Sequence, residues 1–411
     1  MTETAEIAVL GAGVIGLAIA LRLSAEGKEV VLLDPNEPGS GASYGNAGTL
    51  AEYGCVPVGN PSVLRSLPQL LLDADSPFAM RWAALPQLLP WLLRFVRQSL
   101  PAPTRRNTVA LAGLLKDALP AWHDMAAEAG AANLLRANGC LYLYRKQADF
   151  DGSAWSRELR TEMGIHQEIL SPAEIAALEP NLPPVEGRGL FFPDSMNVTD
   201  PAVMMQRLFD AATSKGANFR RVAATSLEPG RDSVRVSGNG IDLTAKTVIV
   251  AAGAYSADLA AQASDRIPLE TERGYHLEFP VDAPLLTRPI CPIDLGFYMT
   301  PLAGRLRAAG TVELGGLQAP PNPARLALIE RGVRQFFPNL TPARSQWLGF
   351  RPSLPDSRPV IGPSRSSPRV IYAFGHGHLG LTLAAVTARL VAKFVAVEND
   401  DAERTFGSTR F

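Results

Sequence analysis

Three glycines near the N-terminus have the spacing of a turn that binds a dinucleotide. Gly11, Gly13 and Gly16 follow the apolar run 7–10 and precede apolar residues at helical spacing. In a strand–turn–helix unit, the first glycine permits the tight turn and the second lets the backbone approach a pyrophosphate. The third lets helix and strand pack closely, and the helix N-terminus offers N–H groups to anionic oxygen. This pattern predicts a pyrophosphate site at the start of the first helix.

An acidic residue stands where the ribose of such a dinucleotide would lie. A second apolar run, 30–33, ends at Asp34. A carboxylate at this point can accept hydrogen bonds from both ribose hydroxyls, and it repels the 2′-phosphate of NADP. Strand, glycines, helix, strand and acid follow one another within about 30 residues. The ordered context favours a dinucleotide site over an incidental glycine-rich turn.

Two further stretches could contact an extended anionic cofactor. Residues 39–48 are small and hydrogen-bonding, and they directly follow the predicted ribose-binding strand. Near the C-terminus, the apolar run 370–374 leads into Gly375-His-Gly-His-Leu-Gly-Leu-Thr382 and then into a helical pattern over 383–395. A helix N-terminus there could stabilise negative charge that develops on a cofactor ring. No metal is expected at His376 and His378, since no nearby cysteine or acidic residue completes a ligand set.

Length and composition indicate a cytoplasmic protein of two domains that binds a small molecule. The chain has 411 residues, a formal net charge of −1 and three widely spaced cysteines, Cys55, Cys140 and Cys291. The length exceeds the usual size of one domain, and the charge gives no reason to expect nucleic acid. The cysteines lack paired C-x-x-C spacing, and the start of the chain lacks a secretory signal. We therefore expect reduced thiols in the cytoplasm.

The periodicity predicts an α/β fold, α+β overall, in which two domains interleave. A helix over 202–214 and strands over 219–224 and 247–252 extend a parallel, Rossmann-like sheet. Shorter alternating runs predict a second, largely antiparallel sheet; they are 140–145, 189–192, 275–279, 297–300 and 306–314. The predicted nucleotide domain comprises 1–60, 197–264 and 346–411. The predicted substrate domain comprises 61–196 and 265–345.

The most apolar stretch, 82–100, is a poor transmembrane candidate. Pro86 and Pro90 interrupt it, and Arg94 and Arg97 add charge. Core or interface helices are the favoured interpretation, because tryptophan and leucine clusters usually pack inside proteins. A position on the inner surface of a membrane stays open as the alternative.

Together these motifs resemble the D-amino-acid oxidase superfamily of FAD-dependent oxidoreductases, which includes glycine oxidase, sarcosine oxidase and bacterial D-amino-acid dehydrogenases. The resemblance spans nearly the whole chain. Besides the opening glycines and Asp34, it is carried by Ser43-Tyr-Gly-Asn-Ala-Gly48, Ala252-Gly-Ala254, the segment 347–362 and Gly375-His-Gly377. The segment 60–100 resembles the dehydrogenases most, and 272–279 resembles the branch that acts on D-proline and D-hydroxyproline.

The resemblance implies noncovalent FAD extended along the parallel sheet, with its reactive ring at the boundary with the substrate domain. Val222 matches a position where family members contact adenine through the backbone. The implied cofactor-binding residues are Gly11, Gly13, Val14, Ile15, Gly16, Asp34, Pro35, Ser43, Asn46, Ala47, Gly48, Val222, Ala252, Gly253, Arg351, Gly375, Gly377, His378, Leu379, Gly380, Leu381 and Thr382.

The resemblance also implies the residues that bind a substrate. Arg351 matches the arginine that binds the substrate carboxylate, since a planar guanidinium neutralises the charge and fixes the orientation of the α-hydrogen. Tyr298 matches a tyrosine that contacts the substrate. Tyr275, His276 and Tyr53 are weaker candidates on segments expected to cross the pocket, and His276 could assist deprotonation of the amine.

The implied activity is oxidation of a small amino acid at its carbon–nitrogen bond, within amino-acid catabolism. The α-hydrogen would pass to FAD as a hydride and leave an imine, with a D-amino acid or a proline-like amine such as D-hydroxyproline as substrate. A glycine or sarcosine oxidase, an FAD-carrying subunit of a heteromeric electron-transfer complex, and an NAD-linked dehydrogenase are the alternatives. The sequence leaves open whether a quinone, oxygen or a partner protein accepts the electrons.

Overall fold

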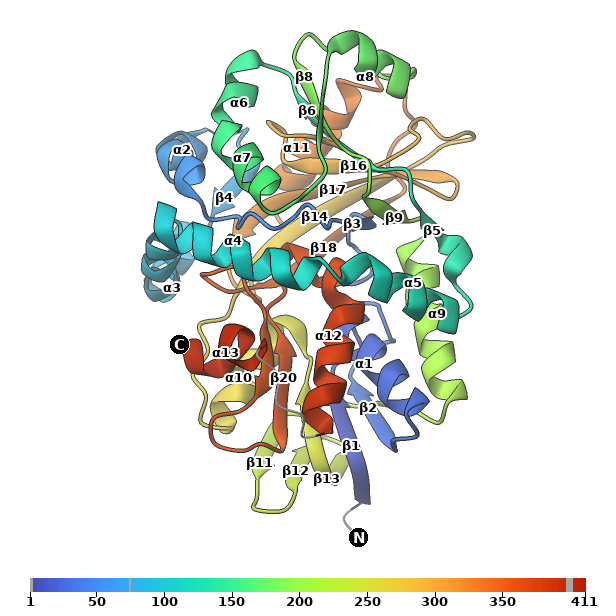
Figure 1. Cartoon of the computed structure of the whole chain (residues 1–411), viewed down its shortest axis with the longest axis vertical. Helices are drawn as coiled ribbons and strands as arrows, with labels where there is room; N and C mark the ends of the chain where they lie inside the picture. Colours follow the sequence, from blue (N-terminus) through green and yellow to red (C-terminus); the bar gives the residue numbers. More distant parts are fainter. Residues whose placement is uncertain (1–2, 74, 397–401) are drawn as a thin grey trace.

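The computed structural model describes residues 3–73, 75–396 and 402–411 of the chain. Two sheets dominate it, one in the lower half of Figure 1 and one in the upper half, and segments from distant parts of the sequence alternate between them. Helices α4 (Pro101–Leu115) and α5 (Ala118–Glu128) run across the middle of the molecule. The fold is therefore the predicted mixed α/β type.

The lower sheet has a parallel core that ends at the nucleotide motif. Its strand order is β10-β2-β1-β13, and β20 pairs with the C-terminal residues of β13 on the side opposite β1. Strand β2 is buried apart from its last residue, as expected for a parallel sheet covered on both faces. The antiparallel strands β12, β11 and β19 complete the sheet. The strands are β1 (Glu3–Leu10), β2 (Val30–Asp34), β10 (Asn218–Arg221), β11 (Ser226–Pro229), β12 (Val234–Gly238), β13 (Ile241–Val250), β19 (Val360–Pro363) and β20 (Val370–Phe374).

Apolar helices cover this sheet, and their N-termini lie at the edge formed by the carboxyl ends of the parallel strands. Helix α1 (Val14–Ala25) lies beside α12 (Gly380–Val395) and α9 (Pro201–Ser214) (Figure 1). Within the described residues, the helical segment Gly377–Val395 alone is long and apolar enough to cross a membrane, and 61% of its apolar stretch is buried inside the protein. That burial is typical of a core helix. Short elements complete this part; they are η3 (Gly253–Tyr255), α10 (Ser256–Gln262), η4 (Gly377–Leu379), α13 (Ala402–Phe406) and η5 (Ser408–Arg410).

The upper sheet is largely antiparallel, as the sequence predicts. Its order is β18-β14-β17-β16-β15-β6-β8-β7, with β4 beside β17. Two pairs, β15 with β6 and β17 with β4, are parallel. The strands are β4 (Phe78–Met80), β6 (Cys140–Tyr144), β7 (Glu168–Leu170), β8 (Arg188–Phe192), β14 (Glu270–Pro280), β15 (Ile290–Pro292), β16 (Phe297–Leu302), β17 (Arg305–Leu314) and β18 (Ser345–Ser353).

The predicted domain boundary at 346 falls inside β18. This strand pairs with β14 along nine residues and so belongs to the upper sheet. The chain then returns to the lower sheet at β19. The division into domains stays a prediction, with β18 as the strand that connects the two sheets.

Smaller elements surround the upper sheet. A short sheet of β3 (Thr49–Leu50), β9 (Met196–Val198) and β5 (Leu135–Arg136) lies between the halves. The remaining helices are α2 (Pro61–Leu72), η1 (Trp82–Ala84), α3 (Leu85–Gln98), η2 (Ala132–Leu134), α6 (Gln147–Gly152), α7 (Ala154–Glu162), α8 (Pro172–Leu178) and α11 (Pro323–Arg334).

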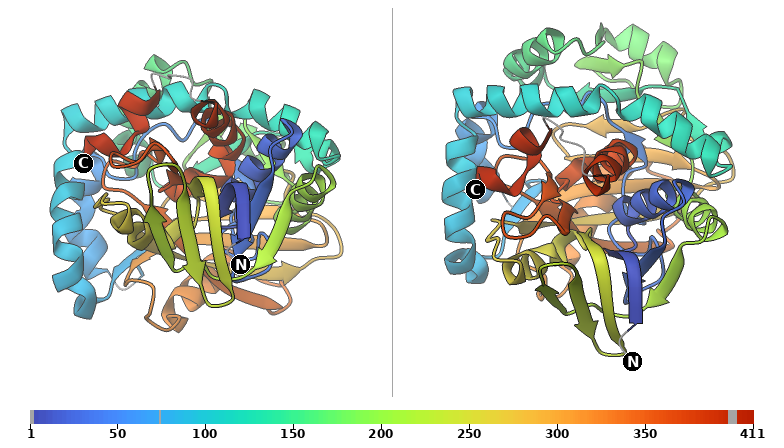
Figure 2. Two further views of the ribbon diagram at one scale, coloured as in Figure 1. Left: turned by 90° about the horizontal axis from the view of Figure 1, so that it is seen from below. Right: turned by 60° about the horizontal axis from the view of Figure 1, so that its bottom comes forward.

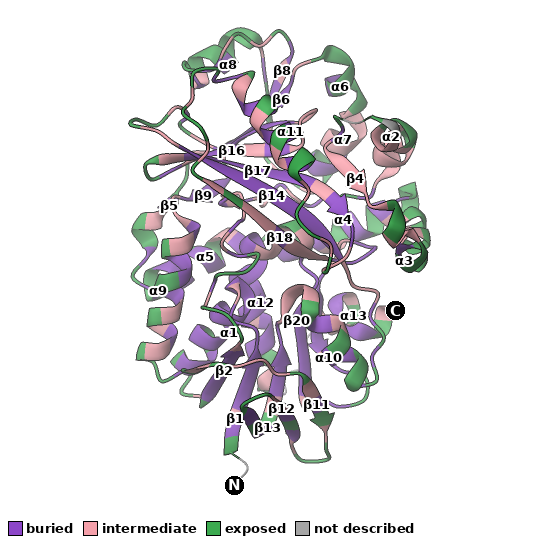
Figure 3. Ribbon diagram, turned by 180° about the vertical axis from the view of Figure 1, so that it is seen from behind, coloured by how far each residue is buried: buried purple, intermediate pink, exposed green. Residues whose placement is uncertain are grey.

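Of the favoured prediction, core or interface helices, the structure excludes a core position for helix α3. Figure 2 shows it at the margin of the molecule, and Figure 3 shows much of its surface exposed. Leu88 and Trp91 are buried, whereas Leu93 and the preceding Trp82 are each 64% exposed. One side of the helix therefore packs against the protein while an apolar side faces outward.

Candidate active site

A cavity of about 1110 Å³ lies between the two sheets. Its wall includes the N-terminal glycine turn, the loop 39–48, the ends of β13 and β20, and parts of β14, β16, β17 and β18. Pockets for one drug-sized ligand span about 300–1000 Å³. This cavity therefore has room for a dinucleotide together with a small substrate.

The three N-terminal glycines have the separate tasks that the spacing predicts. Gly11 has a φ of +108°, and a Cβ on it would lie 2.4 Å from the carbonyl oxygen of Ala251. A Cβ on Gly16 would lie 1.8 Å from the Gly11 carbonyl oxygen, so this glycine serves packing and does not line the cavity. At Gly13, the nearest atom to an added Cβ is the Ser43 hydroxyl at 3.2 Å. Gly13 thus leaves space on the cavity side, where a pyrophosphate would lie.

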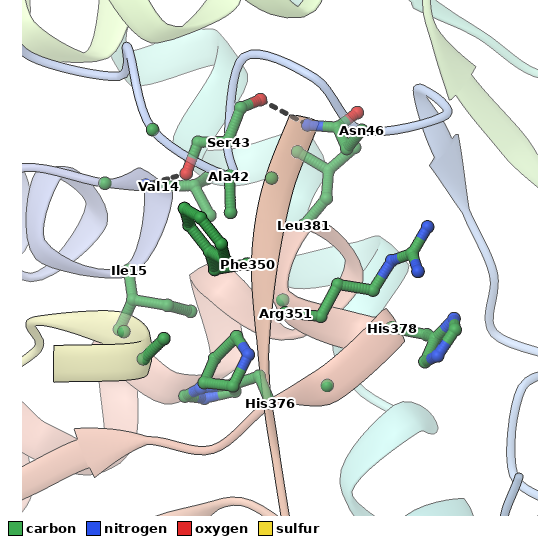
Figure 4. A pocket seen from close by; sticks show the side chains of 18 of the residues that line it. Val14, Ile15, Ala42, Ser43, Asn46, Phe350, Arg351, His376, His378 and Leu381 are labelled. Carbon is green, nitrogen blue, oxygen red and sulfur yellow. Dashed lines mark hydrogen bonds between the residues drawn. The ribbon is translucent and has the colours of Figure 1, made fainter. Parts of the chain in front are cut away.

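Polar contacts fix the loop 39–48 over this turn. The Ser43 hydroxyl accepts a hydrogen bond from the Val14 N–H at 2.8 Å, and the Asn46 amide donates to the Ser43 carbonyl (Figure 4). The Asn46 side-chain oxygen accepts from the Gly48 N–H at 2.7 Å. The hydroxyl proton of Ser43 remains available for a phosphate oxygen.

Asp34 lies at the carboxyl end of β2, beside the glycine turn. One carboxylate oxygen accepts from the Ala12 N–H and the other from the Asn36 N–H, both at 2.8 Å. A carboxylate has about four acceptor positions, so capacity remains for ribose hydroxyls. The carboxylate is thus held at the edge of the cavity as the spacing predicts.

The predicted adenine contact, Val222, lies just outside the part of this segment that lines the cavity. Strand β10 ends at Arg221, where the Val222 N–H turns back to the Arg220 carbonyl. Val222 is not among the described residues that line the cavity, whereas Ala223, Ala224 and Thr225 are. The turn directs the following residues, rather than Val222, toward the cavity.

The second glycine turn approaches the cavity at the N-terminus of α12. Gly375 and Gly377 have φ values of +82° and +53°, which an L-residue with a side chain adopts rarely. Most of the predicted cofactor residues in this region line the cavity; they are Ala252, Gly253, Gly375, Gly377, His378, Leu379, Gly380 and Leu381. Thr382 is the exception, because its hydroxyl accepts from the Ala51 N–H at 2.9 Å and joins α12 to that loop.

The two histidines of this turn have different surroundings. His376 is buried against the Thr387 hydroxyl at 3.0 Å, and burial lowers its pKa to about 3, so it is neutral at physiological pH. The His378 Nε2 lies 2.5 Å from a Glu272 carboxylate oxygen. In the described part of the chain, no group of three or more His, Cys, Asp or Glu side chains could hold a metal ion.

Three tyrosine hydroxyls meet at the substrate-domain end of the cavity. The Tyr298 hydroxyl lies 2.9 Å from that of Tyr142 and 3.3 Å from that of Tyr53. The Tyr53 hydroxyl also donates to the Cys140 sulfur at 3.2 Å. Burial raises the pKa of all three tyrosines well above the ordinary value. They therefore remain protonated and can orient a bound molecule by hydrogen bonds.

Arg351 extends from β18 across β14 into the cavity. Its Nη1 donates to the Thr311 carbonyl at 2.8 Å, and a Cβ on Gly274 would lie 2.3 Å from Nη2. Burial lowers the pKa of Arg351, and the Glu272 carboxylate opposes that shift. Burial raises the pKa of Glu272, but His378 and Arg351 outweigh this effect and lower it below the usual value. Figure 4 shows Arg351 and His378 on the same side of the cavity.

Two weaker site candidates, Tyr275 and His276, are not cavity-lining residues. Side chains alternate between the two faces of β14, so Tyr275 lies on the same face as Arg273, the face opposite to Glu272 and Gly274. There its hydroxyl donates to Glu313 at 2.5 Å. His276 packs between the rings of Tyr44 and Trp347, under the Gly45 carbonyl.

Burial lowers the pKa of His276 to about 4, so it is neutral at physiological pH and could accept a proton only if the substrate reached it. Its position outside the cavity lining removes the expected contact with a substrate amine.

Sequence reasoning missed several residues of the cavity wall, among them Glu272, Tyr142 and Arg160. Glu272 and Tyr142 lie on strands that pair with distant segments, and this pairing decides which face of each strand lines the cavity. Arg160 lies on the short polar helix α7 and is only 8% exposed. No local signal distinguishes it from Arg157 one turn earlier.

A parallel sheet that ends in two glycine turns, with an antiparallel sheet across the cavity, is the arrangement of a dinucleotide-dependent enzyme. Residues 6–394 match the family described as FAD dependent oxidoreductase (DAO). The chain belongs to this family, so its cofactor is FAD and it is an oxidoreductase. This confirms the resemblance and excludes the NAD-linked alternative.

Curated relatives cover the chain along its length. A D-amino-acid oxidase from Bradyrhizobium diazoefficiens is 36% identical over 423 aligned residues, with 100% of both chains covered. A D-amino acid dehydrogenase from Paramagnetospirillum magneticum is 33% identical, with 95% of each chain covered. Among solved structures, glycine oxidase from Geobacillus kaustophilus has a TM-score of 0.77 at 21% identity, with full coverage of both chains. L-proline dehydrogenase from P. horikoshii has a TM-score of 0.74 at 18% identity and covers 100% of this chain and 98% of its own. These two structures show the shared fold.

Proposed function

We propose that this enzyme oxidises D-amino acids at the bond between the α-carbon and nitrogen. The main support is the position of Arg351, which extends into the same cavity that begins at the pyrophosphate turn. The relatives named D-amino-acid oxidase and D-amino acid dehydrogenase are similar over the whole chain, which supports the same substrate class.

In this proposal, Arg351 binds the substrate carboxylate and so fixes the α-carbon. Tyr298, backed by the Tyr142 hydroxyl at 2.9 Å, provides a second point of contact. The buried wall excludes water from the reacting carbon. Bound FAD would supply the acceptor for the α-hydrogen and its electron pair, and water would hydrolyse the imine left on the substrate. A substrate amine that enters deprotonated needs no protein base, which agrees with the position of His276 outside the cavity lining.

The D-hydroxyproline or D-proline assignment has less support than the broader class. It depends on the resemblance of 272–279, yet Arg273, Tyr275 and His276 from that segment do not line the cavity. We therefore propose D-amino acids as the class and treat cyclic amines as members of the test panel.

Anaerobic mixing of the purified FAD-loaded enzyme with single amino acids tests the proposal. We expect D-amino acids to bleach the flavin absorbance and their L-enantiomers to leave it unchanged. Bleaching by L-amino acids alone would contradict the stereochemical assignment. If no member of a panel that includes glycine, sarcosine and the hydroxyproline isomers bleaches the flavin, the alternative of a subunit that needs a partner gains support.

We also propose that the enzyme associates peripherally with an anionic membrane surface through η1 and α3. Leu89, Leu93 and Val96 are exposed along one side of α3, beside the exposed Trp82. The stretch 76–116 contains no aspartate or glutamate, and Arg94 and Arg97 are exposed on α3 itself. An apolar stripe flanked by arginines is complementary to an anionic bilayer rather than to a neutral protein surface. A quinone dissolved in that membrane would then be the electron acceptor within reach.

A further inference from the structure

Arg160 is a buried cation in the cavity wall with unused hydrogen-bonding capacity. Its side chain projects from α7, and the residue is 92% buried. Its Nε donates to the Tyr53 carbonyl at 3.1 Å, while its buried Nη1 has no partner among the described residues. No carboxylate in the described part of the chain lies within ion-pair distance of it. The guanidinium therefore lines the cavity without a counter-ion.

Arg273 and Arg307, whose side chains are fully buried, both have carboxylate partners. Arg273 donates to Glu313 at 2.9 Å, and Arg307 donates to Glu278 at 2.7 Å. An unpaired charge is costly in a buried position, and such charges are normally paired. The contrast indicates that the partner of Arg160 comes from outside the chain.

The surroundings of Arg160 place it at the substrate end of the cavity. Its guanidinium carbon lies 5.5 Å from the centre of the Phe192 ring, which stacks on Tyr53. Burial raises the pKa of Tyr142, and the positive charge of Arg160 partly opposes that shift. Because Tyr142 is hydrogen-bonded to Tyr298, Arg160 belongs to the same wall as the tyrosine hydroxyls. The pyrophosphate position lies elsewhere, at the N-terminus of α1, where Ser43 contacts Val14.

We infer that Arg160 binds a second carboxylate, on the side chain of the substrate, and so selects acidic D-amino acids such as D-aspartate or D-glutamate. This inference depends on the proposed function, in which Arg351 binds the carboxylate that all amino acids share. Two guanidinium groups in one cavity suit a dicarboxylate, because each can form charge-assisted hydrogen bonds with one end.

The test compares each acidic substrate with its amide, which has nearly the same shape and no charge. We expect kcat/KM for D-glutamate to exceed that for D-glutamine on the order of a hundredfold. Arg160→Gln should bring the two values to within a few-fold by lowering the value for D-glutamate. Arg160→Lys should restore part of the difference, since it keeps the charge but loses the planar fork.

Arg157→Gln is the matched control, because Arg157 lies one turn earlier on α7 and does not line the cavity. It should leave the preference unchanged. If Arg160→Gln fails to fold, the inhibition constants of glutarate and its monoamide are compared on the unaltered enzyme. Glutarate should bind on the order of a hundredfold tighter.

Several results would overturn the inference. One is an unaltered enzyme that treats D-glutamate and D-glutamine alike, or glutarate and its monoamide alike. Another is an Arg160→Gln variant that loses activity equally for every substrate, which would indicate a shared carboxylate or a structural role, or one that loses FAD. Failure of the proposed function is a separate outcome, because then no D-amino acid bleaches the flavin, whether acidic or neutral.

Discussion

The two arginines of the cavity differ in how the protein holds them. Arg351 is oriented by the Thr311 carbonyl and stands near the Glu272 carboxylate. Arg160 contacts only the Tyr53 carbonyl through Nε and has no carboxylate beside it among the described residues. A group that is oriented before binding suits the carboxylate common to every substrate, while an unpaired one suits a group that differs between substrates. Arg273 and Arg288, other cations of the upper sheet region, are paired with Glu313 and Glu179.

Arg351→Met should weaken catalysis severely while leaving the flavin spectrum nearly unchanged. Removing one member of a buried charged pair typically costs about 3 to 5 kcal/mol. This corresponds to a loss of about a hundred- to several-thousand-fold in kcat/KM, measured with the best D-amino acid of the panel. Arg351→Lys should recover part of the loss. Arg344→Met, at an exposed position just before β18, is the control, and near-normal kcat/KM in Arg351→Met would assign the carboxylate contact to another group.

At the scale of elements, β14 shows how one strand serves two purposes. Glu272 and Gly274 face the cavity, whereas Arg273 and Tyr275 face the buried ion pairs beside α11. The alternation of side chains along a strand produces this division, and β14 keeps an unbroken register with β18 along its length. Helix α3 is divided in a comparable way, since Trp91 is buried and the opposite side carries exposed leucines.

Charged substitutions on the outer side of α3 should abolish association with membranes. We expect the unaltered enzyme to cosediment with vesicles that contain anionic phosphatidylglycerol and to stay in solution with neutral phosphatidylcholine. The double variant Leu89→Asp, Leu93→Asp should stay in solution with both, because each carboxylate opposes insertion and meets a like-charged surface.

Ile169→Asp provides the matched control for this experiment, since Ile169 is a similarly exposed apolar residue on β7, outside α3. Flavin reduction by substrate should be the same in all three proteins. If the unaltered enzyme does not cosediment with anionic vesicles, the exposed side of α3 does not bind membranes and has another role.

At the scale of the whole molecule, the cavity lies between the two sheets, so a dinucleotide bound in it would contact both. The pyrophosphate turn belongs to the lower sheet, while Arg351 and Tyr298 belong to the upper one. A ligand that binds only the folded protein stabilises it by mass action. Bound FAD should therefore stabilise the arrangement of the two halves as well as carry out redox chemistry.

Removal of FAD should lower the thermal stability of the protein, and added FAD should restore it. At free FAD one hundred times its Kd, the gain is about 2.7 kcal/mol, measured by melting with and without the cofactor. Gly13→Val should fold without retaining FAD or gaining stability from it, because its side chain would enter the pyrophosphate space.

Gly16→Val should instead impair folding itself, because a Cβ there would lie 1.8 Å from the Gly11 carbonyl oxygen.

Denaturation of the unaltered enzyme should release FAD rather than FMN. Full flavin occupancy in Gly13→Val would show that this turn does not hold the dinucleotide.

The nucleotide half of this protein was predictable from local patterns in the sequence. The roles of Gly11, Gly13 and Asp34 depend on neighbours within about 30 residues, and local spacing encodes such a unit. The two sheets were also predictable, because their strands differ in hydrophobic periodicity. The family resemblance predicted Arg351 and Tyr298 as site residues because each lies in a recognisable short motif, and both line the cavity.

Which other side chains line the cavity depends on tertiary contacts that the sequence pattern does not show. Tyr275 and Tyr142 are both tyrosines in apolar strands, yet the pairing of these strands with distant segments places only Tyr142 on a face that lines the cavity. Arg160 and Arg157 look alike on one short helix, but only Arg160 lines the cavity. Such differences arise from contacts between residues far apart in the chain, which local periodicity does not record.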